Sequence, residues 1–279
     1  MNISIIGLGL IGGSMSIALR NKASVKKIYG VDHNPAHCTE AIKLGLVDEI
    51  MMLETAVKIA DLVIISIPVD ATEKILPVIL DLVDTQIVMD VGSAKGVICK
   101  SIRDHPKRNR FVASHPMWGT EYSGPGAAVK GAFANKAAVI CNNEESDAAA
   151  VNLVESIYKL LGMHIVYMNA ASHDLHTAYI SHVSHITSFA LANTVLEKEK
   201  EDENIFELAS GGFESTVRLA KSSPEMWVPI FKQNKDNVLD VLNEHISQLN
   251  KIKDCLEKDN YDQLSELIRH ANTIKRILK

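Results

Sequence analysis

Residues 3–19 constrain the fold more than any other part of the chain. They run ISIIGLGLIGGSMSIAL, an apolar segment followed by Gly7, Gly9 and Gly12 and then by a helical pattern. A membrane span or a signal peptide would also be uncharged, but no basic segment precedes this run and glycines interrupt it. A strand, a glycine turn and the start of a helix explain it better, and they predict the first unit of an α/β sheet.

The three glycines have separate tasks in a turn that binds a dinucleotide. Gly7 permits the tight turn, and Gly9 lets the backbone approach a pyrophosphate. Gly12 lets the helix pack closely on the strand, and the helix N-terminus attracts the phosphate charge. With Leu10 and Ile11 between them, these residues are our predicted cofactor-binding turn. A glycine turn without a ligand is the alternative.

Three further residues complete the predicted cofactor site. Asp32 ends the second apolar run, twenty residues after Gly12, where a carboxylate accepts hydrogen bonds from a ribose hydroxyl and repels a 2′-phosphate. His33 and Asn34 follow it, without Arg or Lys, so we expect NAD rather than NADP. Ser66 and Pro68 end the run 62–68 and should lie near the cofactor, since ligands bind at the carboxyl ends of strands.

The pattern along the chain changes near residue 170. Before it, helical segments alternate with apolar runs that we predict to be strands, at 3–6, 27–32, 62–68, 86–93, 111–116 and 136–142. After it, the periodicity is helical, over 173–200, 204–221, 224–257 and 261–278. We therefore expect an α/β fold, with a Rossmann domain and a mostly parallel sheet at 1–168, followed by an all-α domain at 169–279.

Composition excludes several classes of partner. The 279 residues include 29 Lys and Arg against 34 Asp and Glu, a net charge of −5, which provides no basic surface for nucleic acid. No second long apolar run suggests a membrane segment. The four cysteines, Cys38, Cys99, Cys141 and Cys255, form no CxxC pair and suit a reducing cytosol, so we expect a cytoplasmic protein.

His115 is the first candidate for chemistry. It ends the predicted strand 111–116, at the edge where such sheets bind ligands, and an imidazole there can take the proton of a substrate hydroxyl as hydride leaves the same carbon. A purely structural strand-end histidine is the alternative. Ser93 also ends a strand; it could hold His115 in one tautomer, touch the substrate, or cap the next helix. Lys95 is a rival base, although a lysine one turn into a helix is more often a solvated charge.

The helical half offers a second group of candidates. His182 and His185 are three residues apart and share a helix face, as a site or as satisfied core histidines. His173 and His176 point away from that face, so we expect no metal site. Arg218 matches a carboxylate with two parallel hydrogen bonds, or forms a surface ion pair. Trp227, taken alone, would belong to a core or a dimer interface.

Five stretches together resemble the prephenate/arogenate dehydrogenase family of tyrosine biosynthesis: GLGLIGGS, DVGSAKG, SHPMWGTE, HDLHTAYISHVSH and GGFESTVRLAKSSPEMW. The first motif is shared by many dehydrogenases, but the last four in this order are specific, and the resemblance covers nearly the whole chain. It implies a Rossmann domain followed by a helical domain that forms a homodimer, and a reaction that needs no metal.

The resemblance also implies roles for individual residues. His115 would be the catalytic histidine, Ser93 its assisting serine, and Arg218 the arginine that grips a substrate carboxylate. The substrate site would further include Glu121, Trp227, His182 and His185. Of the two histidines in the H-x-x-H pattern, the second, His185, is associated with enzymes that use prephenate. Trp118 departs from the family pattern, in which a small residue usually stands there.

The implied reaction is the NAD-dependent oxidation of prephenate with loss of carbon dioxide, giving 4-hydroxyphenylpyruvate. Oxidation of arogenate to tyrosine is the alternative within the family. A β-hydroxyacid dehydrogenase has a similar layout but relies on a lysine in its helical domain, where this chain has histidines and Arg218. A protein that binds NAD without turnover is the remaining alternative, and it does not explain why His115 and Arg218 are both present.

Overall fold

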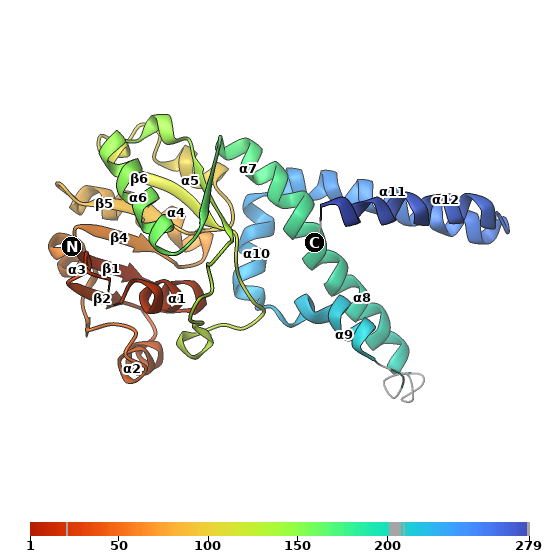
Figure 1. Cartoon of the computed structure of the whole chain (residues 1–279), viewed down its shortest axis with the longest axis horizontal. Helices are drawn as coiled ribbons and strands as arrows, with labels where there is room; N and C mark the ends of the chain where they lie inside the picture. The colour runs from red at the N-terminus through yellow and green to blue at the C-terminus, as the bar shows by residue number, and fades with distance from the viewer. Residues whose placement is uncertain (21, 201–207, 209, 278–279) are drawn as a thin grey trace. The chain divides into compact units, whose positions relative to one another are not determined.

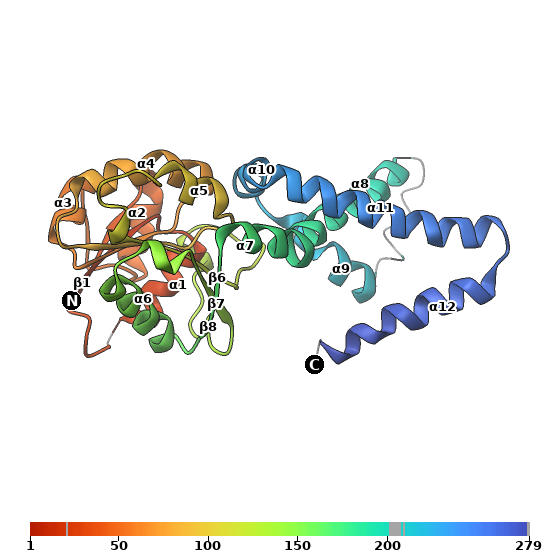
Figure 2. The same ribbon diagram turned by 90° about the horizontal axis from the view of Figure 1, so that it is seen from above.

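The computed structural model describes residues 1–20, 22–200, 208 and 210–277. Its contacts divide the chain into two compact units, Met1–Asn234 and Lys235–Lys279. Figures 1 and 2 show the course of the chain through both units. Each unit is described by itself.

The first unit is built on an eight-stranded sheet with the order β3-β2-β1-β4-β5-β6-β7-β8. Neighbouring strands run parallel at every pairing that the described residues make, except between β6 and β7. The prediction of a mostly parallel sheet is confirmed. The strands are β1 (Asn2–Ile6), β2 (Lys27–Val31), β3 (Glu49–Ile50), β4 (Leu62–Ile65), β5 (Ile87–Asp90), β6 (Phe111–Pro116), β7 (Ala137–Cys141) and β8 (His164–Met168).

Two apolar clusters, one on each face, bury the central strands. On β4, Leu62 and Ile64 belong to one cluster, whereas Val63 and Ile65 belong to the other. This division explains why the sequence of β4 is continuously apolar instead of alternating, since both faces of the strand are covered. Figure 2 shows α1 and α6 on one side of the sheet and α3, α4 and α5 on the other.

The helices of the first unit fall into two groups along the chain. Those that connect strands are α1 (Leu10–Leu19), α2 (Pro35–Lys43), α3 (Leu53–Ile59), α4 (Val69–Leu82), α5 (Gly96–Ser101) and α6 (Ala148–Leu160). Those that follow the last strand are α7 (Ala170–Thr177), α8 (Val183–Glu199), α9 (Gly211–Val217) and α10 (Pro224–Gln233). The predicted order, an α/β sheet domain and then helices, is confirmed.

Several local predictions need correction. Two strands were not predicted: β3 is two residues long, and the residues of β8 are mostly half-exposed, so neither has a strong apolar signal. The predicted strand ends at 68 and 93 lie too far along the chain, because β4 stops at Ile65 and β5 at Asp90. Part of the predicted helix 204–221 lies outside the described residues, which resume as a helix at Gly211.

The predicted helix 173–200 is interrupted by a π-helical turn, Ala178–His182, between α7 and α8. The predicted helix 224–257 is broken at Asn234, which ends α10. The Asn234 side chain is buried, and its amide donates to the Asp174 carbonyl oxygen at 2.7 Å. That contact fixes Asn234 against α7 and explains why two helices replace one.

The second unit consists of α11 (Lys235–Glu257) and α12 (Tyr261–Ala271), followed by a 3-10 turn at Asn272–Arg276. Asn260 caps the start of α12 by accepting a hydrogen bond from the Gln263 backbone N–H. Large apolar side chains remain exposed along both helices, including Ile246, Leu249, Ile252 and Ile268. In the part of the chain that the structure describes, no helix is long and apolar enough to cross a membrane.

The unit boundary at 234/235 differs from the expected domain division at 168/169. Trp227 and Ile230 of α10 and Ala170 of α7 belong to the same buried cluster as β4 and α4. α7 and α10 therefore share a core with one face of the sheet, and packing alone does not separate them from it.

Candidate active site

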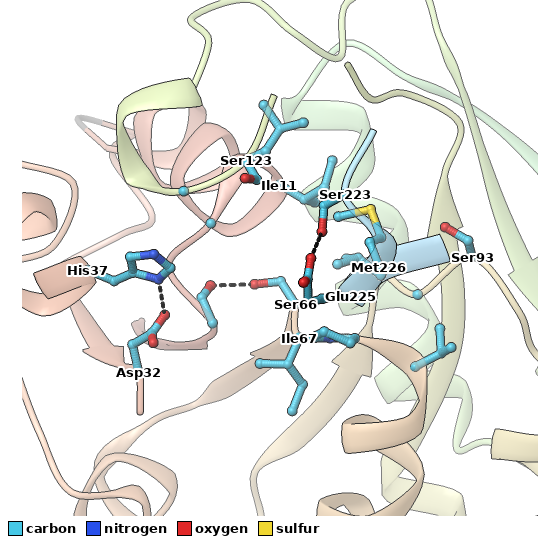
Figure 3. Close-up of a pocket in the computed structure, with 18 of the residues that line it drawn as sticks. Ile11, Asp32, His37, Ser66, Ile67, Ser93, Ser123, Ser223, Glu225 and Met226 are labelled. Atoms are coloured by element: carbon cyan, nitrogen blue, oxygen red, sulfur yellow. Dashed lines mark hydrogen bonds and ion pairs between the residues drawn. The ribbon is translucent and has the colours of Figure 1, made fainter. Parts of the chain in front are cut away.

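The predicted cofactor residues gather around one cavity at the carboxyl ends of the parallel strands (Figure 3). β1 and β4 are neighbours in the sheet, and β2 lies on the far side of β1, so strand order reverses at this point. Such a switch point leaves a crevice for a ligand. Among the lining residues are Gly7, Gly9, Leu10, Ile11, Asp32, Ser66 and Pro68, the predicted set apart from Gly12.

The glycine turn has the geometry that each glycine was expected to provide. Gly7 has φ +95°, a conformation that side chains disfavour. A Cβ on Gly12 would lie 2.1 Å from the Gly7 carbonyl oxygen, so α1 can approach β1 this closely only with glycine there. A Cβ on Gly9 would meet nothing within 4 Å, which leaves its backbone open to the cavity.

Asp32 lies at one end of this cavity, and Figure 3 shows His37 beside it and Ser93 at the opposite end. One carboxylate oxygen accepts a hydrogen bond from the Leu8 N–H and the other from the Asn34 N–H, each at 2.9 Å. The two oxygens together have about four lone-pair sites, so capacity remains for ribose hydroxyls. His37, which was not predicted, places its Nδ1 3.5 Å from Asp32 Oδ2.

A second cavity contains the predicted catalytic histidine. Ser93, His115, His185 and Trp227 all line it, although they come from β5, β6, α8 and α10 of the first unit or the turns beside them. Leu10, Ile11, Val91, Ser93 and Met226 line both cavities. A cofactor in the first cavity and a small molecule in the second would therefore lie against each other.

His115 is buried, and its contacts differ from those expected. Its Nδ1 lies 2.9 Å from His173 Nε2, and His173 Nδ1 lies 2.8 Å from Asp174 Oδ1. Burial holds the pKa of His115 well below its usual value, and the nearby His173 and Lys95 act in the same direction. The imidazole of His115 is thus neutral at physiological pH and able to accept a proton.

The contacts of Ser93 do not support two of the three roles considered for it from the sequence. The residue that hydrogen-bonds His115 Nδ1 is His173, and helix α5 has Lys95 at its N-cap position, so Ser93 is not the cap. What the structure does show is that Ser93 lines both cavities. Contact with the substrate or the cofactor is the remaining role.

The expectation that Lys95 is a solvated charge is wrong. Its side chain is fully buried, forms an ion pair with Asp90, and donates to the Ser114 carbonyl oxygen at 2.8 Å. Asp90 also accepts from the Gly92 and Ser114 N–H groups. This buried pair ties the end of β5 to the residue before His115, so Lys95 supports the histidine instead of replacing it.

His182 and His185 resolve into two different environments. His185 lines the second cavity and stacks on Trp227, with ring centroids 3.4 Å apart. His182 is buried behind it, where its Nδ1 lies 3.2 Å from the Asn234 amide nitrogen. Burial lowers the pKa of His182 to about 4 and also lowers that of His185. His182 thus has the surroundings of a core histidine, whereas His185 lies at a cavity, where a role in a site stays a prediction.

Arg218 and Glu121 contact each other. Arg218 Nη1 lies 2.6 Å from Glu121 Oε2, with the arginine half-exposed and the carboxylate mostly covered. A hydrogen bond from its own backbone N–H, together with Arg218, lowers the pKa of Glu121. Neither residue lines the second cavity, but Thr120 and Leu219, their immediate neighbours, do. The ion pair therefore lies at the border of the cavity.

Four features around the two cavities have no signal in the sequence: His173, Asp174, Asn234 and the Asp90–Lys95 pair. From the sequence, His173 is a candidate only for a metal site, and its helical angle relative to His182 argues against that. Its actual partner, His115, is 58 residues away in the sequence. Within the described residues, no cluster of three or more His, Cys, Asp or Glu side chains is arranged to hold a metal ion.

Two models of one protein family match this chain. A family model described as "Prephenate dehydrogenase, nucleotide-binding domain" matches residues 15–167, and one described as "Prephenate dehydrogenase, dimerization domain" matches residues 169–270. The chain belongs to the prephenate dehydrogenase family. The resemblance inferred from the five motifs is confirmed.

Individual members of the family are similar over nearly the whole chain. A prephenate dehydrogenase of Bacillus subtilis is 33% identical over 273 residues, which are 96% of this chain and 74% of the relative. A crystal structure of prephenate dehydrogenase from A. aeolicus, in complex with hydroxyphenyl propionate and NAD+, superposes with a TM-score of 0.91 at 29% identity, covering 100% of this chain and 98% of that one. Synechocystis arogenate dehydrogenase is 26% identical, with a TM-score of 0.75 and full coverage of both chains.

Proposed function

We propose that this chain is an NAD-dependent prephenate dehydrogenase, which converts prephenate to 4-hydroxyphenylpyruvate and carbon dioxide in tyrosine biosynthesis. The observation that carries the proposal is the position of His115. A buried, neutral imidazole lines the second cavity, which shares lining residues with the first cavity, where the dinucleotide would bind. That is the arrangement needed to remove a hydroxyl proton while hydride leaves the same carbon.

The residues of the first cavity fit NAD. Gly9 leaves its backbone open for a pyrophosphate, and α1 begins at Leu10 with its N-terminus at the cavity. Asp32 retains acceptor capacity for ribose hydroxyls, and its negative charge disfavours the 2′-phosphate of NADP. When bound, NAD supplies the nicotinamide ring that accepts the hydride.

In the proposed mechanism, His115 hydrogen-bonds the ring hydroxyl of prephenate and takes its proton as the carbon–oxygen bond becomes a carbonyl. The ring ketone is then set to lose its carboxylate as carbon dioxide, because that step restores aromaticity. Proton transfer by a placed base contributes about 10²- to 10⁴-fold. The rest of the rate enhancement depends on the placement of the substrate. Ser93, His185 and Trp227 line the same cavity as His115 and would provide that placement.

The substrate is a dianion in an acidic protein, so local cations must bind it. We propose that Arg218 grips a substrate carboxylate, with Glu121 as its partner in the free enzyme. Arginine binds a carboxylate through two parallel hydrogen bonds. When the substrate carboxylate replaces that of Glu121, the positive charge of Arg218 stays compensated. His185 and His182 would act differently, the first touching the substrate and the second holding Trp227 from behind.

Arogenate remains the second candidate substrate, and one contact favours it. His185 Nδ1 lies 3.0 Å from the Ser181 carbonyl oxygen, which can only accept, so the proton of His185 is on Nδ1. Its free Nε2 then accepts hydrogen bonds, as the ammonium group of arogenate requires. The keto and carboxylate groups of the prephenate side chain only accept, so His185 must gain a proton before it donates to them.

The test is the production of NADH by the purified protein with prephenate or arogenate and with NAD or NADP. Turnover of prephenate with NAD supports the proposal, and we expect kcat/KM for prephenate to rise as the pH falls toward the pKa of His185. Turnover of arogenate alone, improving as the pH rises, would keep the mechanism and reverse the choice of substrate. No turnover of either would leave the β-hydroxyacid and non-catalytic alternatives.

We also propose that the protein works as a homodimer through its helical domain and retain the division into domains at 1–168 and 169–279. The exposed apolar side chains on α11 and α12 support an interface between copies, and the two matched family models meet at that division. Light scattering after gel filtration tests the dimer.

For the location of the protein we propose the cytoplasm, since all four cysteines are free, as a reducing compartment keeps them.

A further inference from the structure

We propose that His173 and Asp174 are positioning residues that fix His115 in the tautomer protonated on Nδ1, so that its Nε2 lone pair faces the substrate. The role rests on the proposed function, since a general base needs that lone pair. The hydrogen bonds around the three side chains determine the tautomers one after another, starting from Asp174.

Asp174 is held by the backbone of another element. Its Oδ1 accepts a hydrogen bond from the Lys95 N–H at 2.8 Å, and its Oδ2 accepts one from the Gly96 N–H at 2.7 Å. Both N–H groups belong to the start of α5, where an anion is also favoured by the helix dipole. The carboxylate is therefore fixed in place as an acceptor.

His173 takes its tautomer from this carboxylate. Its Nδ1 lies 2.8 Å from Asp174 Oδ1, and because the carboxylate accepts, the proton must be on His173 Nδ1. Burial lowers the pKa of His173, with Asp174 acting in the opposite direction. The ring is thus neutral with a free lone pair on Nε2. Thr177, whose hydroxyl donates to the His173 carbonyl oxygen at 3.0 Å, steadies the helix at this point.

His115 takes its tautomer from His173. The two nitrogens, His115 Nδ1 and His173 Nε2, are 2.9 Å apart. One must donate and the other accept, and His173 Nε2 has no proton to give. The proton therefore sits on His115 Nδ1, which leaves His115 Nε2 as the unprotonated nitrogen. Within the described residues Nε2 makes no hydrogen bond, and His115 lines the cavity, so this lone pair is available to a substrate hydroxyl.

The same chain of contacts stabilises the product of the proton transfer. When His115 Nε2 gains the hydroxyl proton, the ring becomes a cation in a buried site that also holds Lys95. Asp90 is already paired with Lys95, whereas Asp174 has no lysine or arginine partner in the described part of the chain. Through His173, the negative charge of Asp174 is one ring away from the new positive charge, which lowers the cost of forming it.

The decisive measurement is the tautomer of His115 by ¹⁵N NMR of the protein labelled at histidine, with its signals identified by their loss in His115→Asn. We expect the wild-type ring to be protonated on Nδ1 in the full chain, without substrate. In His173→Leu we expect the proton to move to Nε2, the form that free neutral imidazole side chains prefer. In His173→Gln a side-chain oxygen can again accept from Nδ1, and we expect the wild-type tautomer to return.

Kinetics provide the second readout. We expect His173→Leu to lower kcat by about 10²-fold, at the low end of what a general base contributes, with the Kd for NAD unchanged. His173→Gln should recover part of that loss. The matched control is His176→Leu, a histidine on the exposed face of the same helix, which should leave kcat as in the wild type.

Two results would overturn the proposal: a wild-type His115 protonated on Nε2, or a folded His173→Leu variant with kcat within about twofold of the wild type. The NMR measurement needs no substrate, and for the wild-type tautomer it needs only His115→Asn to identify the signals. If the wild type turned over neither prephenate nor arogenate, the proposed function would fail, and the tautomer measurement would still decide whether the hydrogen-bond chain sets the state of His115.

Discussion

The two cavities of the first unit are built in different ways; we call the first the cofactor cavity and the second the substrate cavity, after the ligands that we propose for them. The residues expected to contact the cofactor lie directly after parallel strands, such as Gly7 after β1 and Asp32 after β2, although Glu225, Met226 and Ile230 of α10 also line that cavity. The substrate cavity depends on side chains from distant segments, with His115 from β6, His185 from α8 and Trp227 from α10. The expected cofactor contacts follow individual strands and are local in the sequence, whereas the residues of the substrate cavity meet only after the helices have packed against the sheet.

This difference explains which residues the sequence could reveal. A glycine turn has a fixed spacing because backbone geometry imposes it. A histidine that orients another histidine has no fixed spacing, because any two elements that pack together can provide the pair. Variants in the cofactor cavity should therefore change NAD affinity or stability, whereas variants in the substrate cavity should change kcat or KM for the substrate.

The largest effect should come from the substrate cavity. We expect His115→Asn to lower kcat by about 10²- to 10⁴-fold, because the proton acceptor is lost while the packing volume is nearly kept. The Kd for NAD should stay unchanged, since His115 does not line the cofactor cavity. Steady-state kinetics and an NAD titration measure the two quantities. A variant with a near-normal rate would remove His115 from the mechanism.

In the glycine turn, Gly12→Ala and Gly9→Ala should affect different properties. Gly12→Ala places a Cβ 2.1 Å from the Gly7 carbonyl oxygen, so we expect a loss of at least about 3 kcal/mol in the free energy of unfolding. Gly9→Ala meets no protein atom within 4 Å, so the fold should be unaffected while the affinity for NAD falls. Urea unfolding and NAD titration check both variants. If Gly12→Ala were as stable as Gly9→Ala, α1 and β1 would be able to move apart without a cost in stability.

At the border of the substrate cavity, Arg218→Ala should raise KM for prephenate by about 10- to 100-fold, the range for a lost hydrogen bond to a charged group. The affinity for NAD should not change. Lys221→Ala, an exposed cation in the same 3-10 turn, is the control and should leave KM near the wild-type value. If both variants raise KM equally, the effect is general attraction of an anion, not a contact with Arg218.

The smallest effect near neutral pH concerns the histidine behind the substrate cavity. Burial lowers the pKa of His182 to about 4 in the folded chain, from 6.5 in the unfolded one, so the fold favours its neutral form. Neutral His182 makes its full contribution to the free energy of unfolding above pH 6.5. Below that pH the contribution falls, and the loss reaches about 3 kcal/mol at pH 4. Urea unfolding at several pH values should show this slope, reduced in His182→Phe. Identical slopes would assign the pH dependence to other groups.

Much of the fold could be predicted from residues alone. Runs such as 62–65 are apolar at every position, and such runs indicate strands that are covered on both faces, whichever elements cover them. β8 could not be found in this way, because its residues are mostly half-exposed and give a weak apolar pattern. The break at Asn234 was also hidden, because it depends on a side-chain contact with α7 across 60 residues of sequence.

The sequence by itself determined the glycine turn, the acidic residue that follows β2, the position of His115 at a strand end and the order of sheet and helices. Each of these depends on neighbours in the chain or on a strand end, so local geometry is enough to fix them. Only the tertiary structure decided that Lys95 is buried, that His182 and His185 have different surroundings, and that His173 and Asp174 contact His115 and the start of α5. Those facts depend on which elements pack together, because burial and hydrogen-bond partners are properties of the packed core and not of the spacing along the chain.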